Sequence, residues 1–327
     1  MPNVICLGEL LIDFCAAEMD TGLAGATRFT KAAGGAPANV AVGVRRLGES
    51  CGFIGAVGND PFGHFLRSTV QAEDVDTSQM VLIDDIRTSL AFIAARSDGM
   101  KDITFYRNPG ADMLLSAEHL DADYLRSAEA FHFGSISRID ELPREATDTA
   151  RRIAENNGAM ISYDPNWRPT LWGDRTAARR HILEAFDCAH IAKVSDEEWE
   201  FITGSGEFDT GARKLLDFGV HLVVRSEGPA GASFATPKTT GHVDGFEVGC
   251  IEPTGAGDGA MAALIVELLK HWRTGITPAD LDNRELTRIL RQANAVGALA
   301  CKKTGAIPSL PTLEEVEKFQ REVAGKG

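Results

Sequence analysis

Short apolar runs alternate with helix-like stretches along most of the chain, and this alternation constrains the fold more than any other feature. Apolar runs bounded by glycine, proline or polar turns are typical of strands, whereas apolar residues recurring every three to four positions are typical of helices. A repeated strand–helix–strand order favours a parallel sheet with helices on both faces. The expected strands are 4–7, 51–57, 130–133, 159–163, 190–194 and 221–225, and the expected helices are 61–72, 144–157, 176–187, 196–203 and 285–302.

Two parts of the chain interrupt this alternation. Residues 13–32 fit no helix pattern, and the β-rich runs 89–97 and 102–107 are joined by a turn at 98–101, which is typical of a hairpin. We expect the segments 13–32 and 86–108 to form a small sheet over the mouth of a ligand site, as a lid inserted in one domain spanning 1–327.

Composition excludes several classes of protein. The net charge of −14 argues against a nucleic-acid partner, although a salt-rich source would also account for the acidity. No apolar run approaches the roughly 20 residues of a membrane helix. Glu9 and Asp13 come too early for a signal peptide. The six cysteines are scattered without a C-x-x-C spacing, so neither zinc nor a disulfide framework is indicated and a reducing cytoplasm fits best.

The segment Glu252–Asp258, Glu-Pro-Thr-Gly-Ala-Gly-Asp, joins a strand-like run at 246–251 to a strong helix pattern at 260–270. The first amides of a helix lack intrahelical partners, and the small residues Gly255, Ala256 and Gly257 leave room for a phosphate beside them. A carboxylate at Asp258 would repel that anion unless it takes a proton from an attacking hydroxyl group. The alternative is that Asp258 only caps the helix.

A second polar and glycine-rich region lies near the amino terminus. Asp13 closely follows the first expected strand, and ligands bind at the carboxyl ends of strands in open α/β sheets. Gly34 and Gly35 allow close backbone approach to a ligand, and Asn39 lies on the first turn of the next helix, where a plain helix start is the alternative. No dinucleotide fingerprint follows the first strand and no P-loop motif occurs, so neither a Rossmann dehydrogenase nor a P-loop kinase is indicated.

Together these segments resemble the ribokinase or PfkB-type family of carbohydrate kinases, most closely its fructokinases, over nearly the whole chain. Gly34–Asn39 and Thr254–Asp258 match the two signature regions, while Phe105–Leu114 and Ser162–Trp172 look specifically fructokinase-like. The resemblance implies a ribokinase-like three-layer α/β/α sandwich with a mostly parallel central sheet and a small β-sheet lid. It also implies transfer of the γ-phosphoryl group of ATP to a ketohexose hydroxyl, with D-fructose giving fructose 6-phosphate.

The resemblance carries roles to individual positions. Asp258 matches the base that activates the sugar hydroxyl, and the amides of Gly255, Ala256 and Gly257 match the anion hole that receives the developing charge. Arg168 matches a position near the transferred phosphate, where a surface ion pair is the alternative. Sugar-contacting positions are matched by Asp13, Gly34, Gly35, Asn39 and Arg107, nucleotide-binding positions by Asn166, Ser195, Ser226, Gly228, Gly231 and Asn294, and an indirect Mg²⁺ position by Glu198.

The sequence departs from the family pattern in three places. The N-x-x-E motif is present as Ser195-Asp-Glu-Glu198, so serine replaces asparagine. The usual Asp-Thr before the anion hole is Glu252-Pro253, at a position that helps relatives hold a monovalent cation, which puts activation by K⁺ in doubt. Ala260 replaces a common aromatic residue. The cofactors that the resemblance implies are ATP and Mg²⁺.

Two other functions remain open at this point. A 2-keto-3-deoxygluconate kinase, or another sugar kinase of the same family, also fits, because Arg107 could pair with a sugar acid. A kinase-like binding protein without activity is the second alternative, and the retained Asp258 and glycines argue against it. The resemblance further implies a homodimer formed through the lid, with sugar and ATP as small-molecule partners and no nucleic-acid or membrane partner.

Overall fold

The computed structural model describes residues 1–97 and 101–325, and its larger sheet has nine strands in the order β13-β12-β11-β10-β9-β8-β1-β4-β5. The strands from β11 to β5 run parallel, and β12 and β13 form an antiparallel edge. The sheet strands are β1 Val4–Leu7, β4 Cys51–Gly58, β5 Met80–Ile83, β8 Ala130–Gly134, β9 Met160–Asp164, β10 Ile191–Ser195, β11 Leu222–Ser226, β12 Gly231–Ala235 and β13 Thr240–Asp244.

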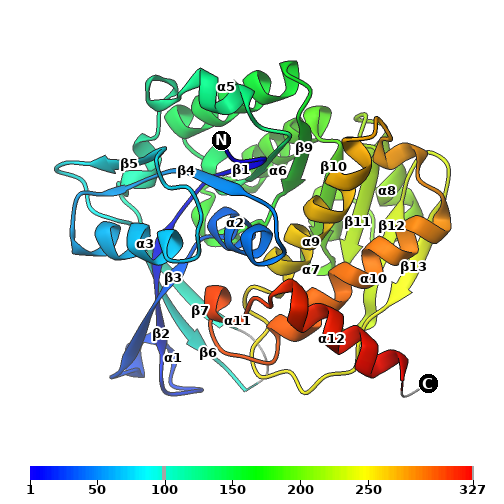
Figure 1. The fold of residues 1–327 in the computed structure, drawn as a ribbon. Coiled ribbons are helices and arrows are strands. Elements are labelled where there is room, and N and C mark those ends of the chain that lie inside the picture. Colours follow the sequence, from blue (N-terminus) through cyan, green and yellow to red (C-terminus); the bar gives the residue numbers. More distant parts are fainter. Residues whose placement is uncertain (98–100, 326–327) are drawn as a thin grey trace.

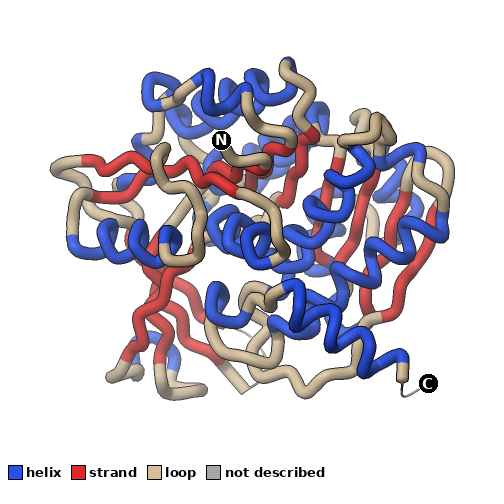
Figure 2. Tube along the Cα trace, in the orientation of Figure 1, coloured by secondary structure: helices blue, strands red, loops and turns tan. Residues whose placement is uncertain are grey.

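Helices cover both faces of this sheet, so the predicted three-layer arrangement is confirmed (Figures 1 and 2). One buried cluster lies under α2, α3, α9 and α10, and a second lies under the helices from α4 to α8. The helices are α1 Gly22–Gly25, α2 Ala36–Arg46, α3 Pro61–Gln71, α4 Ala122–Arg126, α5 Glu141–Asn156, α6 Arg175–Glu184, α7 Asp196–Thr203, α8 Phe208–Leu216, α9 Ala256–Trp272, α10 Asn283–Ala300, α11 Ala306–Ser309 and α12 Leu313–Ala324. Among the described residues, no helix is long and apolar enough to cross a membrane.

A second, four-stranded sheet projects from the first in the order β3-β2-β6-β7 (Figure 1). Only β2 and β6 pair in parallel, and the other two pairs are antiparallel. We call this sheet the lid. Its strands are β2 Leu11–Ala16, β3 Phe29–Gly34, β6 Leu90–Ala95 and β7 Lys101–Tyr106. Most of the turn expected at 98–101 lies outside the described residues.

Period-two alternation gives the lid two unlike faces. Asp13 lies opposite Ala91, which lies opposite Phe105, so these three share one face. Phe14 lies opposite Phe92 on the other face, where their rings stack with centroids 5.1 Å apart. One face therefore carries the carboxylate of Asp13, and the other carries an aromatic cluster.

The prediction of a strand at 246–251 is wrong, because this segment forms no strand in the structure. It lies beyond β13, the edge strand of the large sheet. Phe246 instead packs edge-on against Phe319 of α12, with ring centroids 5.1 Å apart. Its apolar side chain is thus buried by a helix rather than by pairing in the sheet.

Candidate active site

Asp258 and Asn39 meet at the amino terminus of α9. Asn39 Nδ2 donates a hydrogen bond to Asp258 Oδ2 at 2.8 Å, although the residues are 219 positions apart in sequence. Burial raises the pKa of Asp258 to about 6, and the hydrogen bond from Asn39 opposes that rise. The carboxylate is therefore ionised near neutral pH and fixed in direction.

The turn before Asp258 requires glycine. Gly255 has φ +85°, and a Cβ there would lie 3.0 Å from the Cα of Ala306. Ala256 begins α9 immediately afterwards, and its amide donates to the carbonyl of Pro253 at 3.1 Å. The amide of Gly257 belongs to the first turn, where helix amides lack intrahelical partners. This helix end presents backbone donors and positive partial charge beside a carboxylate.

Lys193 supplies a full positive charge at the same place, and the sequence reasoning missed it. Its Nζ lies 2.7 Å from Asp164 Oδ2, with both side chains buried, and a Cβ at Gly257 would lie 3.5 Å from that Nζ. Burial acts to lower the pKa of Lys193, but Asp164 outweighs it and the pKa rises, so the ammonium stays charged. A lysine inside the apolar run of β10 was the available signal, because lysine is almost never fully buried without a partner.

Three strand ends place polar side chains along one edge of the sheet. Asp164 ends β9, Ser195 ends β10 and Ser226 ends β11, and Ser195 lies directly opposite Ser226. The carboxyl ends of parallel strands form the ligand-binding edge of open α/β sheets. The structure therefore brings these residues to the edge where the sequence predicts a nucleotide.

Both carboxylate oxygens of Glu198 accept hydrogen bonds from backbone amides at this edge of the sheet. Its Oε1 accepts from the amide of Ser195 at 2.9 Å, and its Oε2 accepts from the amide of Trp167 at 2.7 Å. Burial and then Asp164 raise its pKa. Among the described residues no group of three or more His, Cys, Asp or Glu side chains suits a metal. The donor set thus fits a Mg²⁺ ion held mainly by phosphate and water, with Glu198 outside its direct ligands.

The expected glycine turn and Asn294 lie near the far edge of the sheet. Gly228 has φ +55° and precedes β12, which begins at Gly231. Asn294 of α10 donates from Nδ2 to the carbonyls of Val243 and Asp244 at 3.0 and 3.2 Å. Its amide group therefore fixes α10 against β13.

Asp13, on strand β2 of the lid, also lies near this site. A Cβ at Gly34 would lie only 2.1 Å from Asp13 Oδ2, so the carboxylate occupies the space that a side chain would fill. Burial raises the pKa of Asp13 to about 6, whereas the charges of Arg168 and Lys101 act to lower it. Arg168 itself is held by long hydrogen bonds from Nη1 to the carbonyls of Asn166 and Trp167, at 3.4 and 3.3 Å.

Glu9, which sequence reasoning did not single out, supports the start of α2. It is 3% exposed, and its Oε1 accepts from the amide of Ala36 at 3.0 Å. Burial raises its pKa to about 7. A carboxyl group directly after the first strand was the signal, because it follows Gly8 in the stretch that leads to Asp13.

Lys101 joins the lid to the loop that precedes the anion hole. Its Nζ donates to Thr254 Oγ1 at 2.7 Å and lies 3.8 Å from Glu252 Oε1. Glu252 also accepts from Thr254 Oγ1 at 2.6 Å and from the amide of Gly305 at 3.0 Å. Both Glu252 oxygens are thus engaged beside an ammonium group, which does not fit a direct role in holding K⁺.

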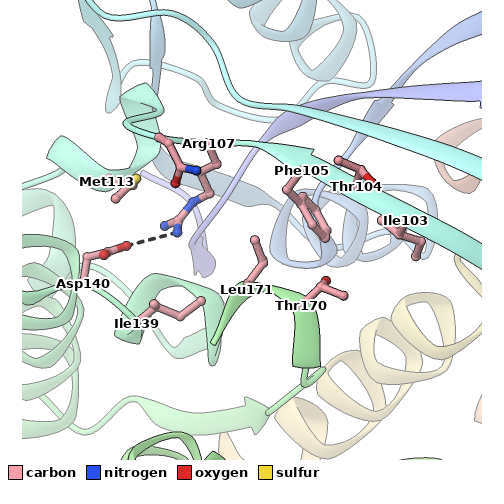
Figure 3. Close-up of a pocket in the computed structure, with 10 residues that line it drawn as sticks. Ile103, Thr104, Phe105, Arg107, Met113, Ile139, Asp140, Thr170 and Leu171 are labelled. Carbon is pink, nitrogen blue, oxygen red and sulfur yellow. Dashed lines mark ion pairs between the residues drawn. The ribbon is translucent and has the colours of Figure 1, made fainter. Parts of the chain in front are cut away.

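Arg107 lines a cavity of about 360 Å³ between β7 and the 3₁₀ turn Pro169–Leu171 (Figure 3). It is 5% exposed, with Nε 2.6 Å from Asp112 and Nη1 3.0 Å from Asp140. Figure 3 shows Arg107 directed toward Asp140, and Phe105 and Leu171 pointing toward one another from opposite sides. The guanidinium is therefore compensated by two carboxylates before any ligand binds.

The large, mostly parallel sheet with helices on both faces and the smaller second sheet form a ribokinase-like α/β fold. A family model described as pfkB family carbohydrate kinase matches residues 1–313. The chain therefore belongs to the pfkB family of carbohydrate kinases.

Individual relatives agree with this assignment. The chain is 42% identical over 317 residues to probable fructokinase-4 of Arabidopsis thaliana, which covers 97% of this chain and 96% of that protein. The crystal structure of a Xylella fastidiosa fructokinase with bound ATP superposes with a TM-score of 0.89 at 31% identity, covering 99% and 100% of the two chains. A double mutant of Vibrio cholerae O395 fructokinase, bound to fructose, ADP and a potassium ion, superposes with a TM-score of 0.85 at 30% identity, covering 98% of each chain.

Proposed function

We propose that this enzyme is an ATP-dependent fructokinase that transfers the γ-phosphoryl group of ATP to D-fructose and forms fructose 6-phosphate. The observation that carries the proposal is the hydrogen bond between Asn39 and Asp258 beside the first amides of α9. An oriented carboxylate beside the start of a helix supports transfer to a hydroxyl group, which requires a base next to a site for phosphate. The named fructokinases among its relatives support fructose as the acceptor.

The chemistry divides between a base and a set of charge-stabilising groups. Asp258 accepts the proton of the attacking sugar hydroxyl, and Asn39 keeps the carboxylate in position. The amide of Gly257, together with the ammonium of Lys193, stabilises the charge that develops on the transferred group. Because transfer passes through a loose transition state, alignment and charge stabilisation supply most of the catalysis.

ATP and Mg²⁺ are the proposed cofactors. Mg²⁺ would neutralise phosphate charge, with Glu198 supporting its surroundings through hydrogen bonds to the amides of Ser195 and Trp167. Ser226, Gly228, Gly231 and Asn294 surround the proposed nucleotide site, and Asn166 precedes Arg168 near the phosphates. We propose no direct K⁺ ligand at Glu252, since Lys101 already lies beside its carboxylate.

The sugar would lie between the lid and α2, where Asp13, Gly34, Gly35 and Asn39 form one wall and Arg107 approaches from the lid. A sugar acid is the competing acceptor, because an arginine could bind its carboxylate. The two carboxylates that already pair with Arg107 favour a neutral sugar. We also propose a cytoplasmic location, which the scattered cysteines support.

ADP release in a coupled assay, measured over fructose, glucose, ribose, adenosine and 2-keto-3-deoxygluconate, tests the proposal. We expect the highest kcat/KM with fructose. A higher kcat/KM with 2-keto-3-deoxygluconate would replace fructose by the sugar acid. The absence of ADP release with every acceptor would leave the proposed activity without support.

A further inference from the structure

Two of the six cysteines meet beside the loop that leads into the anion hole. Cys250 is exposed and lies between β13 and α9, and Cys301 is partly exposed and follows the last residue of α10 (Figure 1). The carbonyl of Cys301 accepts from the amide of Ile251 at 2.7 Å and from the amide of Glu252 at 3.2 Å. Two distant segments of the chain are therefore joined at these cysteines.

The backbone hydrogen bond fixes the distance between the two cysteines. With standard bond lengths and a trans peptide, a bond from the amide of Ile251 to the carbonyl of Cys301 leaves the Cα atoms of Cys250 and Cys301 at most about 6 Å apart. Disulfides span Cα separations of about 4.4 to 6.8 Å. The separation of the two Cα atoms therefore lies within the range that a disulfide spans.

The two thiols are close enough to interact. Burial raises the pKa of the Cys301 thiol to about 11, and the neighbouring Cys250 thiol acts in the same direction. The pair formed by Cys6 and Cys51 differs, because these sulfur atoms lie 3.8 Å apart but both residues are buried at 0% and 2% exposure. An oxidant in solution therefore reaches Cys250 far more easily than the buried pair.

The loop that a disulfide would hold belongs to the working part of the enzyme. Residues 250–254 lead directly to Gly255, and Glu252 of this loop accepts from the amide of Gly305 at 3.0 Å. Lys101 of the lid donates to Thr254 in the same loop. A covalent link from Cys250 to Cys301 therefore acts on the position of the anion hole and on the contact that closes the lid.

We propose that Cys250 and Cys301 form a reversible disulfide on reaction with a low-molecular-weight disulfide, and that this bond restrains the loop before the anion hole and slows turnover. The Cys250 thiolate attacks one sulfur of the oxidant and expels a thiolate, which takes up a proton. The Cys301 thiolate then attacks Cys250 Sγ and expels the second thiolate. Two protein thiols are oxidised to one disulfide, and the oxidant is reduced to two thiols.

The test uses the full-length enzyme treated with glutathione disulfide, followed by removal of the reagent. Wild type, Cys250→Ser, Cys301→Ser and the control Cys188→Ser are digested under non-reducing conditions and assayed as kinases. We expect a peptide linked through Cys250 and Cys301 in wild type and in the control, and in neither of the other variants.

Kinetic measurements distinguish the formation of the disulfide from its effect on turnover. We expect the oxidised wild type to lose roughly tenfold in kcat, since misplacement of catalytic groups by about 1 Å costs up to about 100-fold, and dithiothreitol to restore it. Cys250→Ser should keep its rate after oxidation. A Cys250–glutathione adduct without the internal link would overturn the disulfide, and a complete link with unchanged kcat would overturn the restraint.

The effect on kcat rests on the proposed kinase activity, whereas the peptide map does not. If no sugar is phosphorylated by the reduced enzyme, the proposed function fails and the linked peptide still decides whether the disulfide forms.

Discussion

A base in phosphoryl transfer must be ionised at the working pH and aimed at the hydroxyl group, and Asn39 would serve both needs if Asp258 is the base, as we propose. Its hydrogen bond to Oδ2 opposes the rise in pKa that burial causes, and the pKa of Asp258 stands at about 6. Lys193 and Asp164 lie behind this carboxylate as a buried ion pair. The proposed base therefore belongs to a small cluster of charged side chains.

The first prediction concerns pH. Since Asp258 acts as a base only when deprotonated, kcat should be constant above its pKa and fall as the pH drops through about 6. Asn39→Ala removes a bond that lowers this pKa, so its acid limb should move to higher pH. Profiles of kcat at saturating sugar test this, with Asp13→Asn as the control, because Asp13 also titrates near 6. If only the Asp13 variant shifts the limb, the limb belongs to Asp13.

The second prediction concerns Asp258 directly. Asp258→Asn keeps the shape of the side chain and removes its basicity, so kcat should fall by about 10² to 10⁴ while the Kd for ATP changes little. Isothermal titration gives the Kd and ADP release gives the rate. Retention of more than about a tenth of the wild-type kcat would show that another group takes the proton.

The third prediction concerns Lys193. Lys193→Met removes an ammonium that faces Gly257 and leaves Asp164 buried without its partner. Loss of one preorganised donor costs about 10² to 10³ in kcat, and breaking a buried pair costs about 3 to 5 kcal/mol of stability. Lys193→Met with Asp164→Asn should recover much of the stability and little of the rate. Thermal unfolding and kcat, measured on both variants, separate the two effects, and recovery of the rate in the double variant would limit Lys193 to a structural role.

At the scale of the secondary-structure elements, a contact from strand β7 joins the lid to another part of the chain. Lys101 begins β7, and its Nζ reaches Thr254 in the loop before α9. This ammonium also lowers the pKa of Asp13, on the lid face that looks toward the site. The ammonium of Lys101 therefore lies close both to the loop before α9 and to the carboxylate of Asp13.

The fourth prediction follows from the exposure of this contact. The side chains of Lys101 and Glu252 are 29% and 26% exposed, and such pairs contribute about 0.2 to 1 kcal/mol. Lys101→Ala should therefore raise the KM for sugar by no more than about fivefold. Lys238→Ala, which breaks a surface pair with Asp280, is the control and should leave KM unchanged. An effect of about 100-fold would assign Lys101 to direct substrate binding rather than to closure.

The elements that sequence predicts best are those that repeat. The parallel strands β1, β4, β8, β9, β10 and β11 were predicted from apolar runs, because strands buried on both faces must be almost wholly apolar. The edge strand β5 and the helices α4 and α8 were not predicted. The antiparallel edge strands β12 and β13 were not predicted, and 246–251 was assigned as a strand in their place. β13 is the edge strand and reads Thr-Gly-His-Val-Asp, while β12 is buried between two neighbours but reads Gly-Ala-Ser-Phe-Ala, so neither strand has a strong apolar signal.

The candidate site was likewise predicted only in part from the sequence. Local chemistry was enough to identify the motif around Asp258 and the residues Gly34 and Gly255, since only small residues fit these turns. The pairing of Lys193 with Asp164 could not, because it joins two strands whose register only the folded sheet provides. The pairing of Cys250 with Cys301 is likewise set by the end of α10 rather than by sequence spacing.

At the scale of the whole molecule, the lid face opposite Asp13, here called its outer face, is partly exposed, although Phe14 also packs edge-on against Phe62 of α3 with ring centroids 5.7 Å apart. Phe14 and Phe92 stack there, Phe29 packs edge-on against Phe92, and Tyr106 contacts Phe92 while remaining 64% exposed. β3 and β7 are the edge strands of this sheet. An aromatic face flanked by open strand edges favours association between copies of the chain.

The last prediction is a homodimer in which the outer lid faces of two copies pack together. A two-fold axis would place the aromatic cluster of one copy against the same cluster of the other, and sugar binding should favour this state by closing both lids. Static light scattering at micromolar concentration, with and without fructose, should give twice the monomer mass. Tyr106→Lys puts a charge at an exposed position of this face and should give monomers, whereas Leu142→Lys, at a residue of α5 that is 46% exposed, should not. A monomer mass for the wild type under both conditions would show that the aromatic face stays in contact with solvent, and kinase activity would not alter that conclusion.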